Sequence, residues 1–161
     1  MRMSVQQKAF LLMLLLISLV LPSLSSAAMN ANQAGFNQVP LVSFNIANKA
    51  VANKNWKLAY ATAPNAQVVF MDVCPKTNPA NEVGVEKHPF DQVIYIAQGD
   101  AEVILNGQHI KADAGDMIFI PQGTVHNVIN LNQHKPLKLI SVYSSNDIPA
   151  HAVYPTKASA F

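Results

Sequence analysis

The feature that most constrains this fold is a series of short segments with β-type patterning between Trp56 and Tyr143. From Trp56 onward, apolar residues alternate with polar or small ones, which is typical of a half-buried strand. Asn106-Gly107 predicts a two-residue hairpin, because both central positions of the favoured turn require positive φ. The segments that we expect to form strands are 56–61, 68–73, 92–97, 101–105, 109–112, 117–120, 125–131 and 137–143.

Short strands at this spacing, with no pattern for a long helix, predict an all-β sandwich or barrel. Helices do not alternate with strands, which argues against a doubly wound α/β fold. A chain of 161 residues suits one domain. We place the barrel at residues 56–145. Residues 29–55 should form an arm with weak helical character at 46–55 and one short strand at 39–44, and residues 146–161 a wrapping tail.

The first 28 residues have the anatomy of a secretory signal peptide. Arg2 and Lys8 precede an apolar run at 9–21, and Pro22 and small residues end it. A retained membrane anchor is the alternative, but the run is short for a span of about 20 residues. We therefore predict a cleaved signal at residues 1–28 and a periplasmic or secreted protein, with no membrane association after cleavage.

Charge excludes one class of partner. Without Arg2 and Lys8 the chain keeps nine basic residues, all lysines, against nine acidic ones. Nucleic-acid binding relies on clustered Lys and Arg, and no such cluster is present, so we expect no nucleic-acid partner. Cys74 is the only cysteine and cannot form an internal disulfide. We expect it to be a small buried residue at a strand end.

Four residues form a candidate metal site. Glu86 and His88 are two positions apart, and Gln92 keeps the same parity, so on an extended segment all three share a face. His126 begins another expected strand, which an antiparallel sheet could bring alongside. Such a mixed N/O set suits a divalent Mn, Fe, Co, Ni or Zn ion without selecting one. Asp91 is an alternative oxygen ligand of opposite parity, and ordinary surface roles for Glu86 and His88 also fit the sequence.

The other polar and aromatic residues have simpler interpretations. Asp116 should support a turn through its carboxylate. The residues expected at the surface are His109, His134 and His151; those expected in the core or a pocket wall are Trp56, Tyr95 and Tyr143; and those expected to form turns are Gly99, Gly115 and Gly123.

The sequence resembles the cupin family in two motifs. The pattern Gly115-x5-Pro121-x-Gly123-x2-His126-x3-Asn130 is similar to the second cupin motif, and the run through Glu86, His88, Gln92 and Gly99 resembles the first. The likeness extends over residues 68–143 and implies a single jelly-roll barrel behind the signal peptide. Cupins commonly hold a metal with two His and one Glu from the first motif and one His from the second.

Two positions depart from that pattern. Glu86 stands where the first His is usual, and Gln92 where the Glu is usual, so the single negative charge of the set is moved and not lost. A narrower resemblance links the chain to bacterial cupins labelled mannose-6-phosphate-isomerase-like. That label is a fold analogy more than an activity, and no Lys and Arg cluster for a sugar phosphate is present.

The resemblance implies an exported, metal-binding cupin that acts on a small oxygenated molecule such as a sugar or an oxo acid. Lewis-acid isomerase or lyase chemistry and dioxygenase chemistry are the two expected routes, with Glu86 as a candidate base. The alternative is a non-catalytic module that binds a small molecule, for example a sugar. A third option is a structural barrel whose arm pairs with a neighbour's sheet in a homodimer.

Overall fold

The computed structural model describes residues 40–161, which lie in one compact unit. The expected signal peptide and residues 29–39 of the arm lie outside these residues. Within them no helix is long and apolar enough to span a membrane. The nine strands are β1 (Lys57–Ala63), β2 (Ala66–Val73), β3 (Gln92–Gln98), β4 (Asp100–Leu105), β5 (Gln108–Asp113), β6 (Met117–Ile120), β7 (His126–Asn130), β8 (Leu137–Tyr143) and β9 (Val153–Tyr154).

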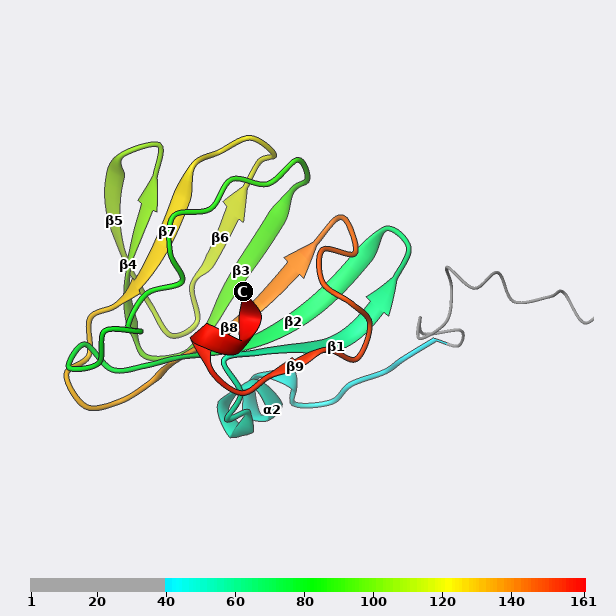
Figure 1. Ribbon diagram of the computed structural model, residues 1–161, viewed down its shortest axis with the longest axis horizontal. Coiled ribbons are helices and arrows are strands. Elements are labelled where there is room, and N and C mark those ends of the chain that lie inside the picture. Colours follow the sequence, from blue (N-terminus) through cyan, green and yellow to red (C-terminus); the bar gives the residue numbers. More distant parts are fainter. Residues whose placement is uncertain (1–39) are drawn as a thin grey trace, which may run out of the picture. The chain divides into compact units, whose positions relative to one another are not determined.

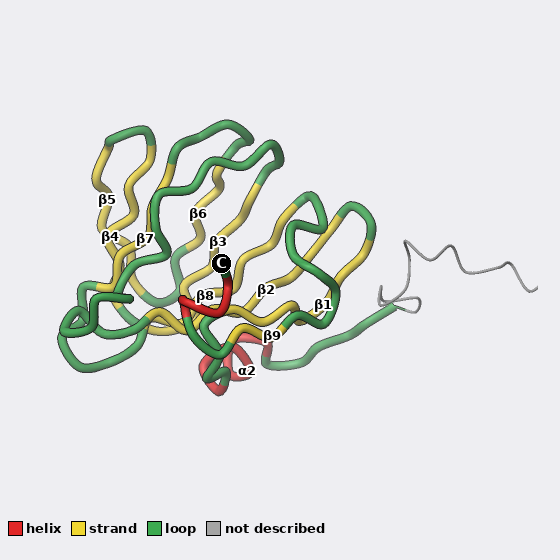
Figure 2. Tube along the Cα trace, in the orientation of Figure 1, coloured by secondary structure: helices red, strands yellow, loops and turns green. Residues whose placement is uncertain are grey.

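These strands form two antiparallel sheets (Figure 1), one of six strands in the order β6-β3-β8-β2-β1-β9 and one of three in the order β5-β4-β7. The helices are α2 (Ile46–Ala52) and the 3₁₀ helix η2 (Lys157–Ala160). Figure 2 shows how little of the described chain is helical. The predicted β architecture is confirmed: β6 and β8 match the predicted bounds, and each other predicted strand begins and ends within two residues of its prediction.

The core lies between the two sheets, where alternate residues of facing strands meet. The inward side chains of the large sheet, for example those of β8, are almost completely buried. The small sheet contributes side chains of β4 and β7 to the same core. Removal of this apolar surface from water is the main favourable contribution to folding. The central members of the core are Val69, Met71, Ile94, Ile96, Val103, Val128, Leu137 and Leu139.

The inward rows change from apolar to polar toward one end of the barrel. On β3, Gln92 has the same parity as Ile94 and is buried. On β8, Ser141 and Tyr143 continue the inward row, and on β7 His126 precedes Val128. Fully buried polar side chains are costly unless they find partners, so this end is the place to look for function.

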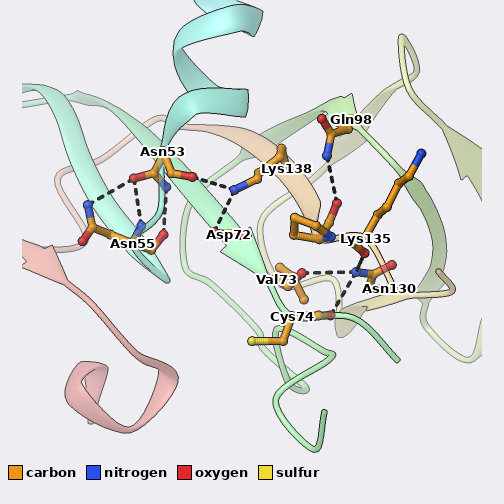
Figure 3. Close-up of polar contacts among 10 residues, drawn as sticks. Asn53, Asn55, Asp72, Val73, Cys74, Gln98, Asn130, Lys135 and Lys138 are labelled. Carbon is orange, nitrogen blue, oxygen red and sulfur yellow. Dashed lines mark hydrogen bonds and ion pairs between the residues drawn. The ribbon is translucent and has the colours of Figure 1, made fainter. Parts of the chain in front are cut away.

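The outer face of the large sheet is covered by α2, which packs Ala50 on Phe70 and Ile140. Lys138 of β8 fixes the end of this helix. Its buried ammonium group donates to the backbone oxygen of Asn53 at 2.6 Å and pairs with Asp72 Oδ2 at 2.7 Å (Figure 3). The expectation that the 68–73 strand has both faces covered is therefore confirmed.

Asn130 joins three segments at the opposite end of β7. Its Nδ2 atom lies 3.2 Å, 2.9 Å and 2.9 Å from the carbonyl oxygens of Val73, Cys74 and Lys135 (Figure 3). Cys74 was predicted to be buried at a strand end. In the structure it is only half-buried. Asn130 of the motif that resembles the second cupin motif therefore has a structural role here.

The predicted strand at 39–44 is wrong for the part that the structure describes, because residues 40–44 have no strand pairing. The physical reason lies at the start of β1, where the outer edge of Lys57 and Leu58 is already occupied. The tail returns as β9, which pairs Val153 with Leu58 and Tyr154 with Lys57. With β2 on its other side, β1 has no free edge at that point, and the chain from Pro40 leads instead into α2.

Candidate metal centre

Glu86, His88 and His126 bring one carboxylate and two imidazoles together, with their ligand atoms all within 4.8 Å of one another. The backbone fixes two of them. Glu86 and His126 form an isolated antiparallel bridge, in which each N–H donates to the other residue's carbonyl oxygen at 2.8 Å and 2.9 Å. Residues directly opposite in such a pair project their side chains to the same face, so the bridge places carboxylate and imidazole side by side.

The two oxygens of Glu86 face different partners. Oε2 lies 3.3 Å from His88 Nε2 and 3.9 Å from His126 Nε2, whereas Oε1 lies 3.9 Å from the ammonium nitrogen of Lys57. Burial by itself would raise the pKa of Glu86. The hydrogen bond from His88 and the positive charge of Lys57 outweigh burial and hold this pKa below its usual value. Glu86 is therefore an ionised carboxylate at neutral pH, as a metal ligand must be.

His126 is oriented by a contact on the far side of its ring. Nδ1 lies 3.0 Å from the carbonyl oxygen of Thr124. Because a carbonyl only accepts, this contact assigns the proton to Nδ1 and leaves the lone pair on Nε2 facing Glu86. Metal-binding histidines are typically held in this manner, with one nitrogen donating to a backbone carbonyl.

Two buried acceptor atoms in this region have no hydrogen-bond partner among residues 40–161: His126 Nε2 and Gln92 Oε1. Gln92 uses its other amide atom, because Nε2 lies 3.4 Å from Ser141 Oγ. An unpaired buried acceptor costs about 1–3 kcal/mol, and two in one region need an explanation. Both atoms are electron-pair donors, so a cation satisfies them and a hydrogen-bond acceptor does not. The residues present fit a metal ion.

An aromatic wall supports His88. Its ring stacks on Phe90 with centroids 4.7 Å apart, and Tyr143 contacts both rings, at 5.8 Å from His88 and 5.3 Å from Phe90. Burial and the negative charges of Glu86 and Asp147 raise the pKa of Tyr143 far above its usual value. The phenol is therefore neutral at any physiological pH and can act only as a neutral donor or acceptor.

The cluster is open on the side of His88. The side chains of His126, His88 and Glu86 are 2%, 14% and 20% exposed. A pocket of about 550 Å³ adjoins His88, and it is lined by Lys87, His88, Pro89, Gln122 and Gly123. His88 is the member of the cluster that also lines this pocket, so it connects the two.

Other sequence expectations have mixed outcomes. Asp91 lies outside the cluster, because its Oδ1 accepts from the backbone N–H of Gln122 at 2.9 Å. Gln92 is buried on the inward face of β3, and its role as a fourth ligand stays a prediction. Asp116 supports its turn by accepting from the Asp113 N–H at 2.8 Å. The three remaining histidines are exposed, as predicted: His109, His134 and His151.

Sequence analysis missed Lys57. The alternation of Trp56, Leu58 and Tyr60 had suggested a strand with one apolar face, which would place Lys57 in water. In the structure α2 covers Leu58 and Tyr60, and Lys57 lies on the inward face with Ala59. When both faces of a strand are covered, alternation alone does not show which face points inward. The sequence therefore held no signal that placed Lys57 on the inward face.

Comparison with known proteins identifies the family of this chain. The family model described as "Cupin domain" matches residues 76–143, the segment that carries all three clustered residues. The structure also superimposes on the crystal structure of BH2720 from Bacillus halodurans with a TM-score of 0.70 and 30% identity, over 77% of this chain and 95% of that one. The chain belongs to the cupin superfamily.

Two curated relatives of this cupin are similar over most of its length. A protein of Acanthamoeba polyphaga mimivirus is 34% identical over 119 residues, which cover 70% of this chain and 69% of the relative. The Bacillus subtilis protein YrkC is 33% identical over 123 residues, which cover 72% of this chain and 63% of YrkC. Both are described as "Uncharacterized protein", so neither suggests a substrate. The mannose-6-phosphate-isomerase-like label stays a prediction.

Proposed function

We propose that this cupin binds one divalent first-row metal ion through Glu86, His88 and His126, with Gln92 as fourth ligand, and acts on a small oxygenated molecule. The observation that carries the proposal is the pair of unpartnered buried acceptors, His126 Nε2 and Gln92 Oε1, in a site where Glu86 is ionised. Two imidazole nitrogens and two oxygens suit Mn, Fe, Co, Ni or Zn.

A bound ion of this kind would supply Lewis-acid polarisation of a carbonyl group or, if it is iron, dioxygen chemistry. The protein's own groups have separate tasks. Thr124 holds the imidazole of His126 in one tautomer. Phe90 and Tyr143 pack against His88 and keep water from that side of its ring. Glu86 has a lowered pKa, which suits a ligand and makes it a weak general base.

Metal analysis of the purified mature protein tests this function. We expect close to one equivalent of a divalent metal per chain in the wild type and a large loss in His126→Ala. The matched control is His109→Ala, because the His109 side chain is 59% exposed and pairs with Glu102, away from the cluster. Equal metal content in the wild type and His126→Ala would contradict the proposal, as would a wild type that binds no metal when supplied with each of these ions.

A non-catalytic binding role is the second candidate, and the aromatic wall beside the pocket favours it. Ligand pockets often combine aromatic walls with a few polar groups. His88 lines the pocket, and the rings of Phe90 and Tyr143 pack against it. A screen of sugars and oxo acids with the metal-loaded protein separates the two roles. Turnover of any of them excludes a purely binding function.

Export is part of the proposal and rests on the sequence of residues 1–28. Expression of the full chain in a bacterium should give a periplasmic or secreted product whose mass corresponds to cleavage after Ala27 or Ala28. An uncleaved product of full mass in the cytosol would count against export and would leave the metal site untouched.

A further inference from the structure

We propose that the substrate of this site is a small anion, a carboxylate or a comparable oxyanion, and that Lys57 is the residue that binds its negative charge. This inference rests on the proposed function, because it assumes that Glu86, His88 and His126 hold a divalent ion. It adds the charge of the substrate and a specificity residue that lies outside the metal ligands.

Lys57 opens β1 and is held rigidly there. Its backbone pairs with Met71 of β2 on one side and Tyr154 of β9 on the other. The side chain is only 11% exposed and points into the barrel. A lysine is almost never buried to this degree unless it has a partner, so its position in the barrel needs a reason.

The partner that the structure provides is incomplete. The ammonium nitrogen lies 3.9 Å from Glu86 Oε1, and this is its one polar contact among the described residues. That distance is too long for a hydrogen bond, while an ammonium group carries three donors. Lys138 provides the contrast, because its buried ammonium has two short contacts, at 2.6 Å and 2.7 Å. Lys57 therefore retains donors for a further acceptor.

The charges of the site lead to the same conclusion. A histidine must be neutral to ligate a metal, so in the metal-bound site the protein charges are the negative charge of Glu86 and the positive charge of Lys57, which cancel. A divalent ion leaves an excess of two positive charges in a partly buried place. Excess charge in such surroundings is unfavourable unless it is paired. A neutral sugar leaves the excess unchanged, whereas a carboxylate ligand reduces it.

The two halves of Glu86 place the two positive groups next to each other. Oε2 faces the imidazoles that would hold the metal, and Oε1 faces Lys57. An anion with two oxygens can therefore use the metal and the ammonium group together. A second carboxylate near this region is that of Asp147. It is exposed, and its negative charge contributes to the raised pKa of Tyr143.

The pocket that adjoins His88 has the same sign of charge. The pocket beside His88 is lined by Lys87 and by no acidic residue among those described. Apart from Glu86 itself, the nearest acidic residue in sequence is Asp91, and its Oδ1 accepts a hydrogen bond from the backbone N–H of Gln122. A mouth with positive charge and no opposing carboxylate attracts anions.

The test compares two small ligands that differ in charge. Pyruvate and hydroxyacetone both carry a carbonyl group on a three-carbon skeleton, and only pyruvate is an anion. Each is titrated into the Mn²⁺-loaded mature protein, and binding is followed by the relaxation of water protons near Mn²⁺, which needs no turnover. We expect pyruvate to bind at least about tenfold more tightly, since a hydrogen bond to a charged group contributes about 1.5–3 kcal/mol.

Substitution then assigns the preference to Lys57. In Lys57→Met the advantage of pyruvate should fall by about tenfold, with the Mn²⁺ content unchanged, while Lys57→Arg should keep most of the advantage. Lys54→Met is the matched control, because Lys54 is exposed in the neighbouring loop, and it should behave as the wild type.

Each outcome decides a different claim. Equal binding of pyruvate and hydroxyacetone by the Mn²⁺-loaded wild type overturns the anion inference and leaves the proposed metal function standing. A pyruvate preference that survives in Lys57→Met overturns the role of Lys57. A wild type that takes up no metal removes the proposed function and this inference with it. The comparison on the unaltered protein needs no variant, so it decides the charge preference even if Lys57→Met does not fold.

Discussion

Glu86 and His126 face each other across an isolated antiparallel bridge, with reciprocal backbone hydrogen bonds of 2.8 Å and 2.9 Å. Forty residues separate them in sequence, yet their side chains share one face and approach to 3.9 Å. The arrangement is fixed by main-chain hydrogen bonds. A site organised in this way loses little entropy when it binds an ion, and several consequences can be measured.

Metal should stabilise the folded protein. An ion that binds only the native state at roughly 100 times its Kd adds about 2.7 kcal/mol. We therefore expect thermal unfolding of the wild type to shift upward on addition of Mn²⁺ or Zn²⁺ and to shift much less in Glu86→Gln, which loses the charged ligand. His109→Ala should shift as the wild type does. A similar increase in Glu86→Gln would show that the stabilising ion binds elsewhere.

Gln92→Met should separate stability from metal affinity. The substitution removes the unpaired Oε1 acceptor and keeps the length of the side chain, so the metal-free stability should change by less than about 1 kcal/mol. Metal affinity should fall, because one oxygen ligand is gone. Urea unfolding of the metal-free protein and a competition titration with a chelator measure the two quantities. Unchanged affinity would remove Gln92 from the ligand set.

Lys138→Ala should be strongly destabilising. The substitution leaves Asp72 without its partner and the Asn53 carbonyl without its donor in a buried place, at a cost of about 3–5 kcal/mol. Replacement of both partners, in Lys138→Met with Asp72→Leu, should recover most of this loss. Urea unfolding of both variants provides the measurement, and a double variant as unstable as Lys138→Ala would argue against the ion pair as the cause.

The raised pKa of Tyr143 predicts a loss of stability in alkali. Its phenol is kept neutral in the native state, whereas in the unfolded chain it ionises near pH 10. The stabilising effect is complete below that value and decreases as the pH rises above it, because only the unfolded state then gains from releasing the proton. Ultraviolet titration of folded Tyr143→Phe should show the same number of ionised tyrosines at pH 11 as the wild type. One fewer in the variant would mean that Tyr143 ionises in the native state.

Several elements were predictable because their signals are local. The bounds of β6 and β8 follow from runs of apolar residues ended by turn residues, and Asn106-Gly107 has positive φ at both positions, as its sequence requires. Glu86, His88 and His126 were identified from ligand type, spacing and motif. Local patterns could not show the pairing of β9 with β1, which leaves residues 40–44 without a partner strand. They could not place Lys57 either, because the position of α2 decides which face of β1 is inward.

The edge of the large sheet opposite β9 is formed by β6. At this edge β6 pairs only with β3 among the described strands, and its side chains Met117 and Phe119 are 62% and 57% exposed. Unpaired main-chain groups flanked by apolar side chains invite self-association in concentrated solution. Phe119→Lys is therefore the surface change that we expect to keep the protein monodisperse during crystallisation, and light scattering of the two proteins at equal concentration measures its effect.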